Sequence, residues 1–178
     1  MRTNTRMLVL SALFAALTAV GAFLKIPVGV SSFTLQFLFT ALAGVLLGPR
    51  YGALSQAAYV LLGLFGLPVF TMGGGPGYLL QPTCGFLLGL IPAAWLAGKL
   101  AGEEARPRRV MAAAAAGLGA MYLVGIPYMY AVLNLYLGRG MTWGQVLMAG
   151  MVLFLPFDGL KIAAAGLLAK PLLRALRR

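Results

Sequence analysis

The sequence predicts an all-α integral membrane protein: a bundle of six transmembrane helices with the N- and C-termini cytoplasmic. Three observations predict it. The chain of 178 residues is 61% hydrophobic and 10% charged, with a mean hydropathy of +0.93, which is more apolar than a water-soluble domain requires. Its apolar runs are continuous rather than alternating, which favours helices over a barrel. Its basic residues fall in short clusters between these runs.

Apolar runs bounded by charges or by glycine and proline define the expected helices. The first run, residues 7–24, follows a basic start as in a signal peptide, but about 18 apolar residues can cross a bilayer, so we expect a transmembrane helix. The second and third runs are short for a hydrocarbon core about 30 Å thick, and the fifth can kink at Pro127. The helices cover residues 6–24, 34–48, 51–66, 83–101, 108–137 and 156–175, in one membrane domain spanning 1–178.

The stretch before the last helix contains signals for a further short helix. Thr142 and Gln145 have the spacing of a capping box, so a short external helix is expected over residues 143–154. Pro156 suits the first turn of the following helix, which places Asp158 towards the external side. One long helix kinked at Pro156 is the alternative, and it places Asp158 nearer the membrane midplane.

Charge placement orients the helices. Of the 14 Lys and Arg residues, most fall on one side of this topology, so the positive-inside rule places both termini in the cytoplasm of a cell-membrane protein surrounded by lipid. The clusters form no continuous basic face, so no nucleic-acid partner is expected despite the net charge of +11. The cytoplasmic group is Arg2, Arg6, Arg50, Lys99, Arg106, Arg108, Arg109, Lys170, Arg174, Arg177 and Arg178; the external group is Lys25 and Arg139.

Few residues are available for catalysis. The chain has no histidine, one cysteine and three acidic residues, so no enzyme, metal centre or cofactor is expected. Glu103 and Glu104 are the only paired acids, and a solvated basic loop explains them more simply than a membrane enzyme acting on a lipid or isoprenoid. No G-x-x-x-x-G-K-[ST] stretch occurs, so a transporter built from this chain takes its energy from a partner or acts passively.

Asp158 and Lys161 are the strongest candidates for a binding site. They lie three positions apart in an apolar segment, so on a helix their side chains share a face. Burying either charge alone costs at least about 2.5 kcal/mol on insertion scales, so such groups face a partner, a cavity or a pathway. A structural ion pair is one interpretation; the favoured one is a site for a ligand with both hydrogen-bond donors and acceptors.

Two external connections add polar and aromatic candidates. Residues 63–89 are uncharged and rich in glycine and proline, which indicates a lid or pocket wall rather than a purely connecting loop. Residues 25–37 end with two hydrogen-bonding side chains at the outer mouth of the bundle. The candidates on these segments are Phe70, Gly74, Tyr78, Gln81 and Thr83 on the first and Thr34 and Gln36 on the second.

The first helix carries a ridge of small residues at spacings of four, on which another helix can pack closely. Packing inside the bundle and docking of a partner protein are both open for this ridge. Its alanines are Ala12, Ala15, Ala16 and Ala19.

Four stretches, spread in order over nearly the whole chain, are informative as a set. They are TLQ at 34–36, GLPVF at 66–70, GYLLQPTCGFLLG at 77–89 after a glycine pair, and PFDGLK at 156–161. Together they resemble the BioY family, the biotin-specific substrate-capture (S) components of energy-coupling factor (ECF) transporters. The resemblance implies a six-helix bundle that binds biotin from outside and docks on a membrane-embedded T component driven by two cytoplasmic ATPases.

The resemblance also implies roles for the candidates. Asp158 accepts a ureido N–H of biotin, and Lys161 donates to the ureido oxygen or the valerate carboxylate. Phe70, Tyr78 and their neighbours pack the apolar part of biotin, and the alanine ridge meets the T component. An S component for another vitamin and a small stand-alone permease are the alternatives.

Overall fold

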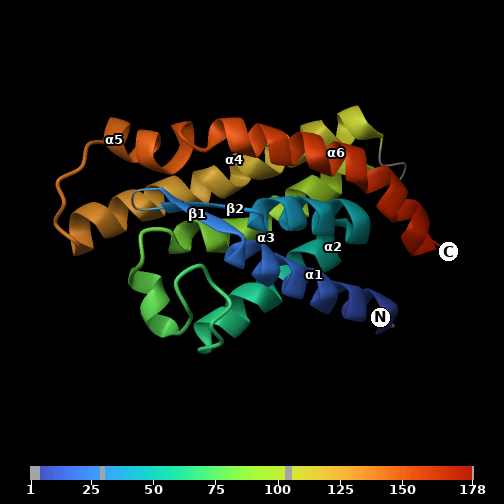
Figure 1. Cartoon of the computed structure of the whole chain (residues 1–178), viewed down its shortest axis with the longest axis horizontal. Helices are drawn as coiled ribbons and strands as arrows, with labels where there is room; N and C mark the ends of the chain where they lie inside the picture. The colour runs from blue at the N-terminus through green and yellow to red at the C-terminus, as the bar shows by residue number, and fades with distance from the viewer. Residues whose placement is uncertain (1–4, 29–30, 103–105, 178) are drawn as a thin grey trace.

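The computed structural model describes residues 5–28, 31–102 and 106–177, and it is mostly helical (Figure 1). Glu103 and Glu104 lie outside the described residues. The elements are α1 (Thr5–Phe23), β1 (Lys25–Val28), β2 (Ser31–Thr34), α2 (Gln36–Leu64), the 3₁₀ turn η1 (Pro76–Leu80), α3 (Cys84–Ala101), α4 (Pro107–Ala131), the π-helical turn η2 (Val132–Tyr136), α5 (Trp143–Leu147), the π-helical turn η3 (Met148–Val152) and α6 (Leu155–Arg177).

Five helical segments of the described chain are long and apolar enough to cross a membrane, and the protein is a multi-pass membrane protein. The last two segments join consecutive elements, because α4 continues through η2 and α5 continues through η3 into α6. The segments are Thr5–Phe23, Gln36–Leu64, Cys84–Ala101, Pro107–Tyr136 and Trp143–Leu176.

Helix α2 doubles back on itself at Gly48. This residue has φ 80° and ψ 174°, outside the helical region, and Pro49 follows it. The Gln36 side-chain amide donates to the Tyr59 hydroxyl at 2.8 Å although 23 positions separate them; in one straight helix they would lie about 35 Å apart. The segment therefore consists of two antiparallel arms, which occupy the positions of the expected helices 34–48 and 51–66.

A buried polar network joins the two arms of α2 to α1. Gln56 accepts a hydrogen bond from the Thr40 hydroxyl at 2.9 Å, and its amide donates to the hydroxyls of Ser55 at 3.0 Å and Thr18 at 3.2 Å. All four side chains are fully buried. Because each polar group has a partner, this network holds three helical segments in one register without an unpaired group in the apolar interior.

The bundle packs through small residues. A Cβ atom added to Gly44 would lie 2.2 Å from the Ala94 carbonyl oxygen, and one added to Gly98 would lie 2.5 Å from the Gly44 carbonyl oxygen. The backbones of α2 and α3 therefore touch at a point that only glycine allows. In sequence, α1 packs on α2, α2 on α3 and α3 on α4, and α6 closes the bundle against α4 and α2 (Figure 1).

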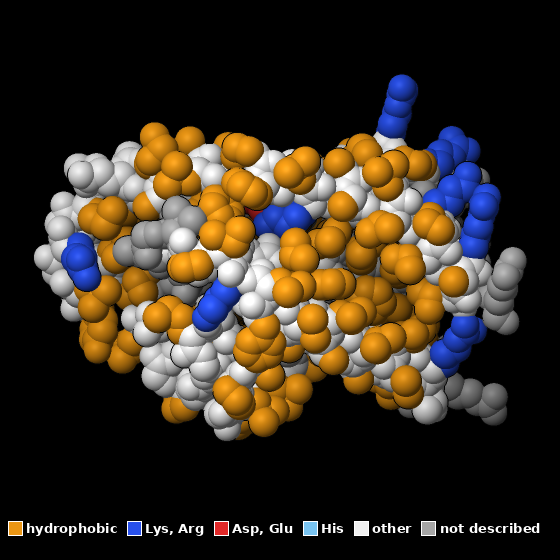
Figure 2. Space-filling model, in the orientation of Figure 1, with side chains coloured by type: hydrophobic (Ala, Val, Ile, Leu, Met, Phe, Trp, Pro, Cys, Tyr) orange, Lys and Arg blue, Asp and Glu red, His pale blue; other side chains and the backbone are white. Residues whose placement is uncertain are grey.

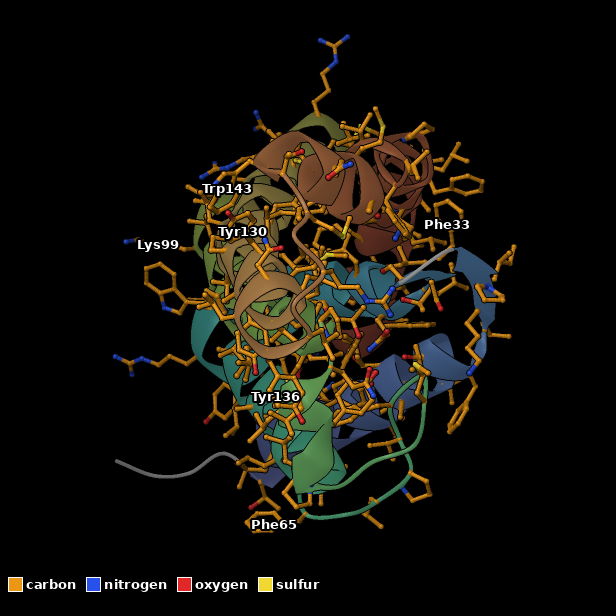
Figure 3. All side chains as sticks on the ribbon, turned by 90° about the vertical axis from the view of Figure 1, so that its left-hand side faces the viewer. Phe33, Phe65, Lys99, Tyr130, Tyr136 and Trp143 are labelled. Carbon is orange, nitrogen blue, oxygen red and sulfur yellow. The ribbon has the colours of Figure 1, made fainter. Side chains whose placement is uncertain are left out.

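A short antiparallel hairpin connects α1 to α2, where the sequence predicted an external loop without strands. Strand β1 pairs with β2 in the register Lys25 to Thr34 and Ile26 to Phe33. The Phe33 ring packs on Phe154 and Phe157, with ring centroids 4.5 and 4.2 Å away. This aromatic contact fixes the hairpin against the start of α6; Figure 3 shows Phe33 beside the hairpin.

The surface separates charge from apolar side chains along the long axis. Figure 2 shows the Lys and Arg side chains gathered mainly at the right-hand end, which is the end where both chain termini lie in Figure 1. Hydrophobic side chains cover the middle of the face shown in Figure 2. Strongly exposed apolar side chains include Leu123, Leu160 and Leu167, at 79%, 68% and 68% exposure. This distribution suits a bundle whose sides face lipid and whose charged end faces water.

Candidate functional site

Helix α6 positions the predicted pair of charges. The helix begins at Leu155, and Asp158 lies in its first turn. Because the spacing of three puts both side chains on one face, Lys161 Nζ forms an ion pair with Asp158 Oδ1, with side chains only 11% and 3% exposed. The pair is thus formed inside the protein and removed from bulk water.

Two further elements complete the surroundings of the pair. The Tyr122 hydroxyl of α4 donates a hydrogen bond to Asp158 Oδ2. Lys161 Nζ also donates to the backbone carbonyl of Thr34, at the end of β2, at 3.2 Å. Each oxygen of the carboxylate therefore has a partner, while the ammonium group joins α6 to the hairpin and retains one donor.

The pair lies about halfway along one helical run. The capping box predicted at Thr142 and Gln145 is confirmed, since each side chain bonds the other's backbone N–H. The run that starts there continues through α5, η3 and α6 along the upper edge of Figure 1 and ends at Leu176. The alternative of one long helix thus describes this region better than a separate external helix over 143–154. Asp158 lies inside the bundle rather than at its outer end.

A cavity of about 500 Å³ opens beside the pair. This volume lies within the range usual for small-molecule sites. The walls come from the hairpin, the start of α2, residues 71–83, α3, α4 and the α5–α6 run. The polar and charged lining residues are Lys25, Ser31, Ser32, Thr34, Gln36, Thr71, Tyr78, Gln81, Thr83, Tyr122, Arg139, Asp158 and Lys161; apolar lining includes Phe37, Phe86, Leu87, Met121, Leu133 and Phe154.

Most of the candidate ligand contacts predicted from the sequence meet at this cavity. Besides Asp158 and Lys161, the lining contains Gln36, Tyr78, Gln81 and Thr83. These residues come from α6, α2 and the connection between α2 and α3, so the fold brings together segments that are far apart in sequence.

Two candidates, Phe70 and Gly74, lie outside the cavity lining. Phe70 is 1% exposed, and its ring packs on Tyr59 and Tyr78 at centroid distances of 5.4 and 4.6 Å. A Cβ atom on Gly74 would lie 2.0 Å from the Leu67 carbonyl oxygen. Phe70 therefore supports Tyr78 from behind, while Gly74 allows a close backbone contact with Leu67 within the connection between α2 and α3.

Gln36 combines a place in the cavity wall with a structural role. Its Oε1 accepts from the Thr34 hydroxyl at 3.0 Å and its Nε2 donates to the Tyr59 hydroxyl, which in turn donates to the Val69 carbonyl at 3.0 Å. The amide therefore links the end of β2 to both arms of α2. A ligand at this side chain meets a group whose orientation is already fixed.

Several lining residues were not among the candidates. Tyr122 lies in the expected helix 108–137, where a polar hydroxyl in an apolar stretch is a usable signal. Lys25 and Arg139 were used only to orient the helices. Ser31 and Ser32 belong to the hairpin, whose sequence cue is two short runs flanking Gly29.

The alanine ridge of α1 divides between two environments. Ala12 and Ala16 are exposed, Ala19 is half-buried, and Ala15 is buried at 5% exposure. Exposed Val9 and Leu13 flank the two exposed alanines, at 63% and 50%. The outer face of α1 is thus a smooth apolar surface formed by Ala12 and Ala16, while Ala15 packs inside the bundle.

The sequence profile of the BioY family matches residues 1–178, the whole chain. The chain belongs to the BioY family. It is 44% identical over 176 residues to a probable biotin transporter BioY of Lysinibacillus sphaericus, covering 98% of this chain and 90% of that one. It is 40% identical over 165 residues to the biotin transporter BioY of Thermotoga maritima, covering 92% and 94%.

A solved structure supports this membership at the level of the fold. The crystal structure of the S-component for biotin from an ECF-type ABC transporter matches with a TM-score of 0.71 and 26% identity, over 97% of this chain and 94% of that chain. BioY proteins are transporter components, so the chain is not an enzyme.

Proposed function

We propose that this chain is the high-affinity biotin-binding S component of an ECF-type vitamin importer. The observation that carries the proposal is the cavity of about 500 Å³ with the Asp158–Lys161 pair in its wall. The ureido ring of biotin presents N–H donors and a carbonyl acceptor, which match a carboxylate and an ammonium group respectively. Family membership and the biotin transporters among its relatives point to the same ligand.

Within this proposal, Asp158 accepts a ureido N–H and Lys161 donates to the ureido oxygen. The lone pairs of the carboxylate that Tyr122 and Lys161 leave free are available to the ligand. Tyr78, Phe86 and Phe154 offer ring surfaces for the thiophane ring and the aliphatic chain, and Gln36, Gln81 and Thr83 offer further hydrogen bonds. Phe70 and Gly74 support this wall without touching the ligand.

The proposed topology has six spans in the cell membrane, with both termini in the cytoplasm. The two antiparallel arms of α2 supply two of the six spans, which gives an even number. Lys and Arg side chains gather mainly at the end where both chain termini lie (Figure 2), as the positive-inside rule expects for the cytoplasmic side. The cavity lies towards the opposite, external half.

Transport in this proposal needs partners, because the chain contains no P-loop. A T component docks on the exposed face of α1, where Ala12 and Ala16 allow another helix to approach closely. Two cytoplasmic ATPases drive the T component, and reorientation of the bundle against it carries biotin inward.

The test is isothermal titration of biotin into the purified, ligand-free protein in detergent. The wild type is expected to bind tightly, and Asp158→Asn and Lys161→Ala each to lose at least about 1.5 kcal/mol, the value of a charge-assisted hydrogen bond. Thermal unfolding of each variant controls for folding. Folded wild-type protein that gives neither heat nor a thermal shift with biotin would refute the proposal, and titration with other vitamins then tests a different S-component specificity.

A further inference from the structure

The described cavity wall carries positive charge in addition to the Asp158–Lys161 ion pair, called the inner pair below. Its lining contains the cations Lys25, Arg139 and Lys161, and Asp158 is the acidic residue among the described lining residues. The Asp158–Lys161 pair is neutral as a unit. Lys25 and Arg139 therefore leave two positive charges without a countercharge in the described wall, and an anionic group on a ligand would supply one.

The backbone of Lys25 lies close to the inner pair, while its ammonium group lies at Thr71, another residue of the cavity wall. It is the register partner of Thr34 in the hairpin, so their Cα atoms lie about 5 Å apart. The Thr34 carbonyl accepts from Lys161, whereas Lys25 Nζ donates to the carbonyl of Thr71, on the connection between α2 and α3. Two ammonium groups, that of Lys25 on the hairpin and that of Lys161 on α6, thus line one cavity.

Lys25 and Arg139, the outer cations of the cavity, keep N–H donors that are available for a ligand. An ammonium group has three N–H donors, and Lys25 uses one of them in its hydrogen bond to the Thr71 carbonyl. Arg139 follows η2 on the connection to α5, and its guanidinium group makes no hydrogen bond or ion pair with the part of the chain that is described. Both side chains are exposed, so their remaining donors are accessible to a ligand.

We infer that Lys25 and Arg139 form a carboxylate-binding subsite at the outer part of the cavity, separate from the Asp158–Lys161 subsite. The inference rests on the proposed function, because it assigns the two ends of one biotin molecule to two places. Biotin carries its ureido ring at one end and its carboxylate at the other. The neutral inner pair suits the uncharged ureido group, and the outer cations suit the carboxylate. Lys161 then serves the ureido oxygen and not the carboxylate.

The outer subsite has a consequence for selectivity. A ligand that lacks the carboxylate keeps every contact with the inner pair but loses the outer charge pairing. Because the outer cations are partly solvated, this pairing is weaker than a buried one and sensitive to salt. Discrimination between biotin and an uncharged ester therefore reports on Lys25 and Arg139 alone.

The experiment compares biotin with biotin methyl ester by titration calorimetry on the full chain in detergent. The variants are Lys25→Met, Arg139→Met and the double variant, with Arg50→Met as the control, since Arg50 is exposed and is not part of the cavity lining. The wild type and Arg50→Met are expected to bind biotin at least about tenfold more tightly than the ester. The double variant is expected to bind both equally, at the affinity that the wild type has for the ester. Raising the salt concentration should weaken binding of biotin and leave the ester unchanged.

The outcomes separate this inference from the proposed function. Equal affinity of the wild type for biotin and the ester, or a preference for biotin that persists in the double variant, overturns the carboxylate subsite and leaves biotin binding intact. No binding of either compound by folded wild-type protein overturns both. Retained ester binding also shows that a variant is folded, so loss of biotin preference cannot be attributed to misfolding.

Discussion

The Tyr122 hydroxyl on α4 donates to the Asp158 carboxylate on α6, across 36 positions of sequence. Both side chains are buried, at 8% and 2% exposure. With Lys161 on the other carboxylate oxygen, the phenol fixes the rotation of the group that faces the cavity. A ligand at this site meets an acceptor that is already oriented, which lowers the entropy lost on binding.

Tyr122→Phe is therefore expected to lower both stability and ligand affinity. Removal of the hydroxyl leaves one oxygen of a buried carboxylate short of a partner, at a cost of about 1–3 kcal/mol of unfolding free energy. Thermal unfolding in detergent and biotin titration measure the two effects. Tyr136→Phe is the matched control, because Tyr136 is 59% exposed. Equal behaviour of the two variants would contradict the role of the Tyr122 hydroxyl.

The ion pair on α6 can be tested for a structural role and a ligand role separately. Asp158→Asn alone, or Lys161→Met alone, leaves one buried charge without its partner and is expected to destabilise by about 3–5 kcal/mol. The double variant leaves no unpaired charge, and the asparagine oxygen still accepts from Tyr122. It should regain most of the stability while biotin binding stays lost. A double variant that binds biotin like the wild type would contradict a ligand role for the pair and leave it only a structural role.

Gly48 is expected to tolerate no side chain, for reasons of backbone conformation alone. Its φ of 80° and ψ of 174° lie in a region that is essentially restricted to glycine, yet a Cβ atom there would meet nothing within 4 Å. Gly48→Ala should therefore destabilise by about 1–3 kcal/mol through strain. The control is Gly119→Ala, in helical backbone with equally open surroundings, which should be neutral or slightly stabilising. Thermal unfolding of the two variants gives the comparison.

The outer face of α1 gives a prediction about partners. Ala16→Trp places a large ring on the exposed apolar face and is expected to abolish co-purification with a T component by preventing close helix approach. Biotin titration should remain unchanged, because Ala16 is not part of the cavity lining. Ala115→Trp on the exposed side of α4 is the matched control. Co-purification that survives Ala16→Trp but not Ala115→Trp would move the docking surface to α4.

The sequence indicated the helices and the ion pair because both depend on local properties. Continuous apolar runs require helices in lipid, and the spacing of Asp158 and Lys161 requires a shared helical face. The break between the expected helices 34–48 and 51–66 lies at Gly48, where glycine and proline together end a helix. These features need no knowledge of which segments pack together.

The rest of the site depends on packing and was not accessible in this way. Which face of α4 turns towards α6 decides the contact of Tyr122 with Asp158, and helical periodicity carries little information when all faces are apolar. The hairpin was missed because its strands are four residues each and β1 contains Pro27. Phe70 was assigned to the ligand for its type, whereas its burial against Tyr59 and Tyr78 decides its place.

The reversal of α2 at Gly48 also bears on how the chain enters the membrane during synthesis. The arms on either side comprise 12 and 16 residues, each shorter than the roughly 20 that a lone helix needs to span the hydrocarbon core. Gln56 and Thr40 satisfy each other only when the arms lie together, so one arm alone would expose polar groups to lipid. The two arms are therefore suited to leave the insertion machinery as one helical hairpin.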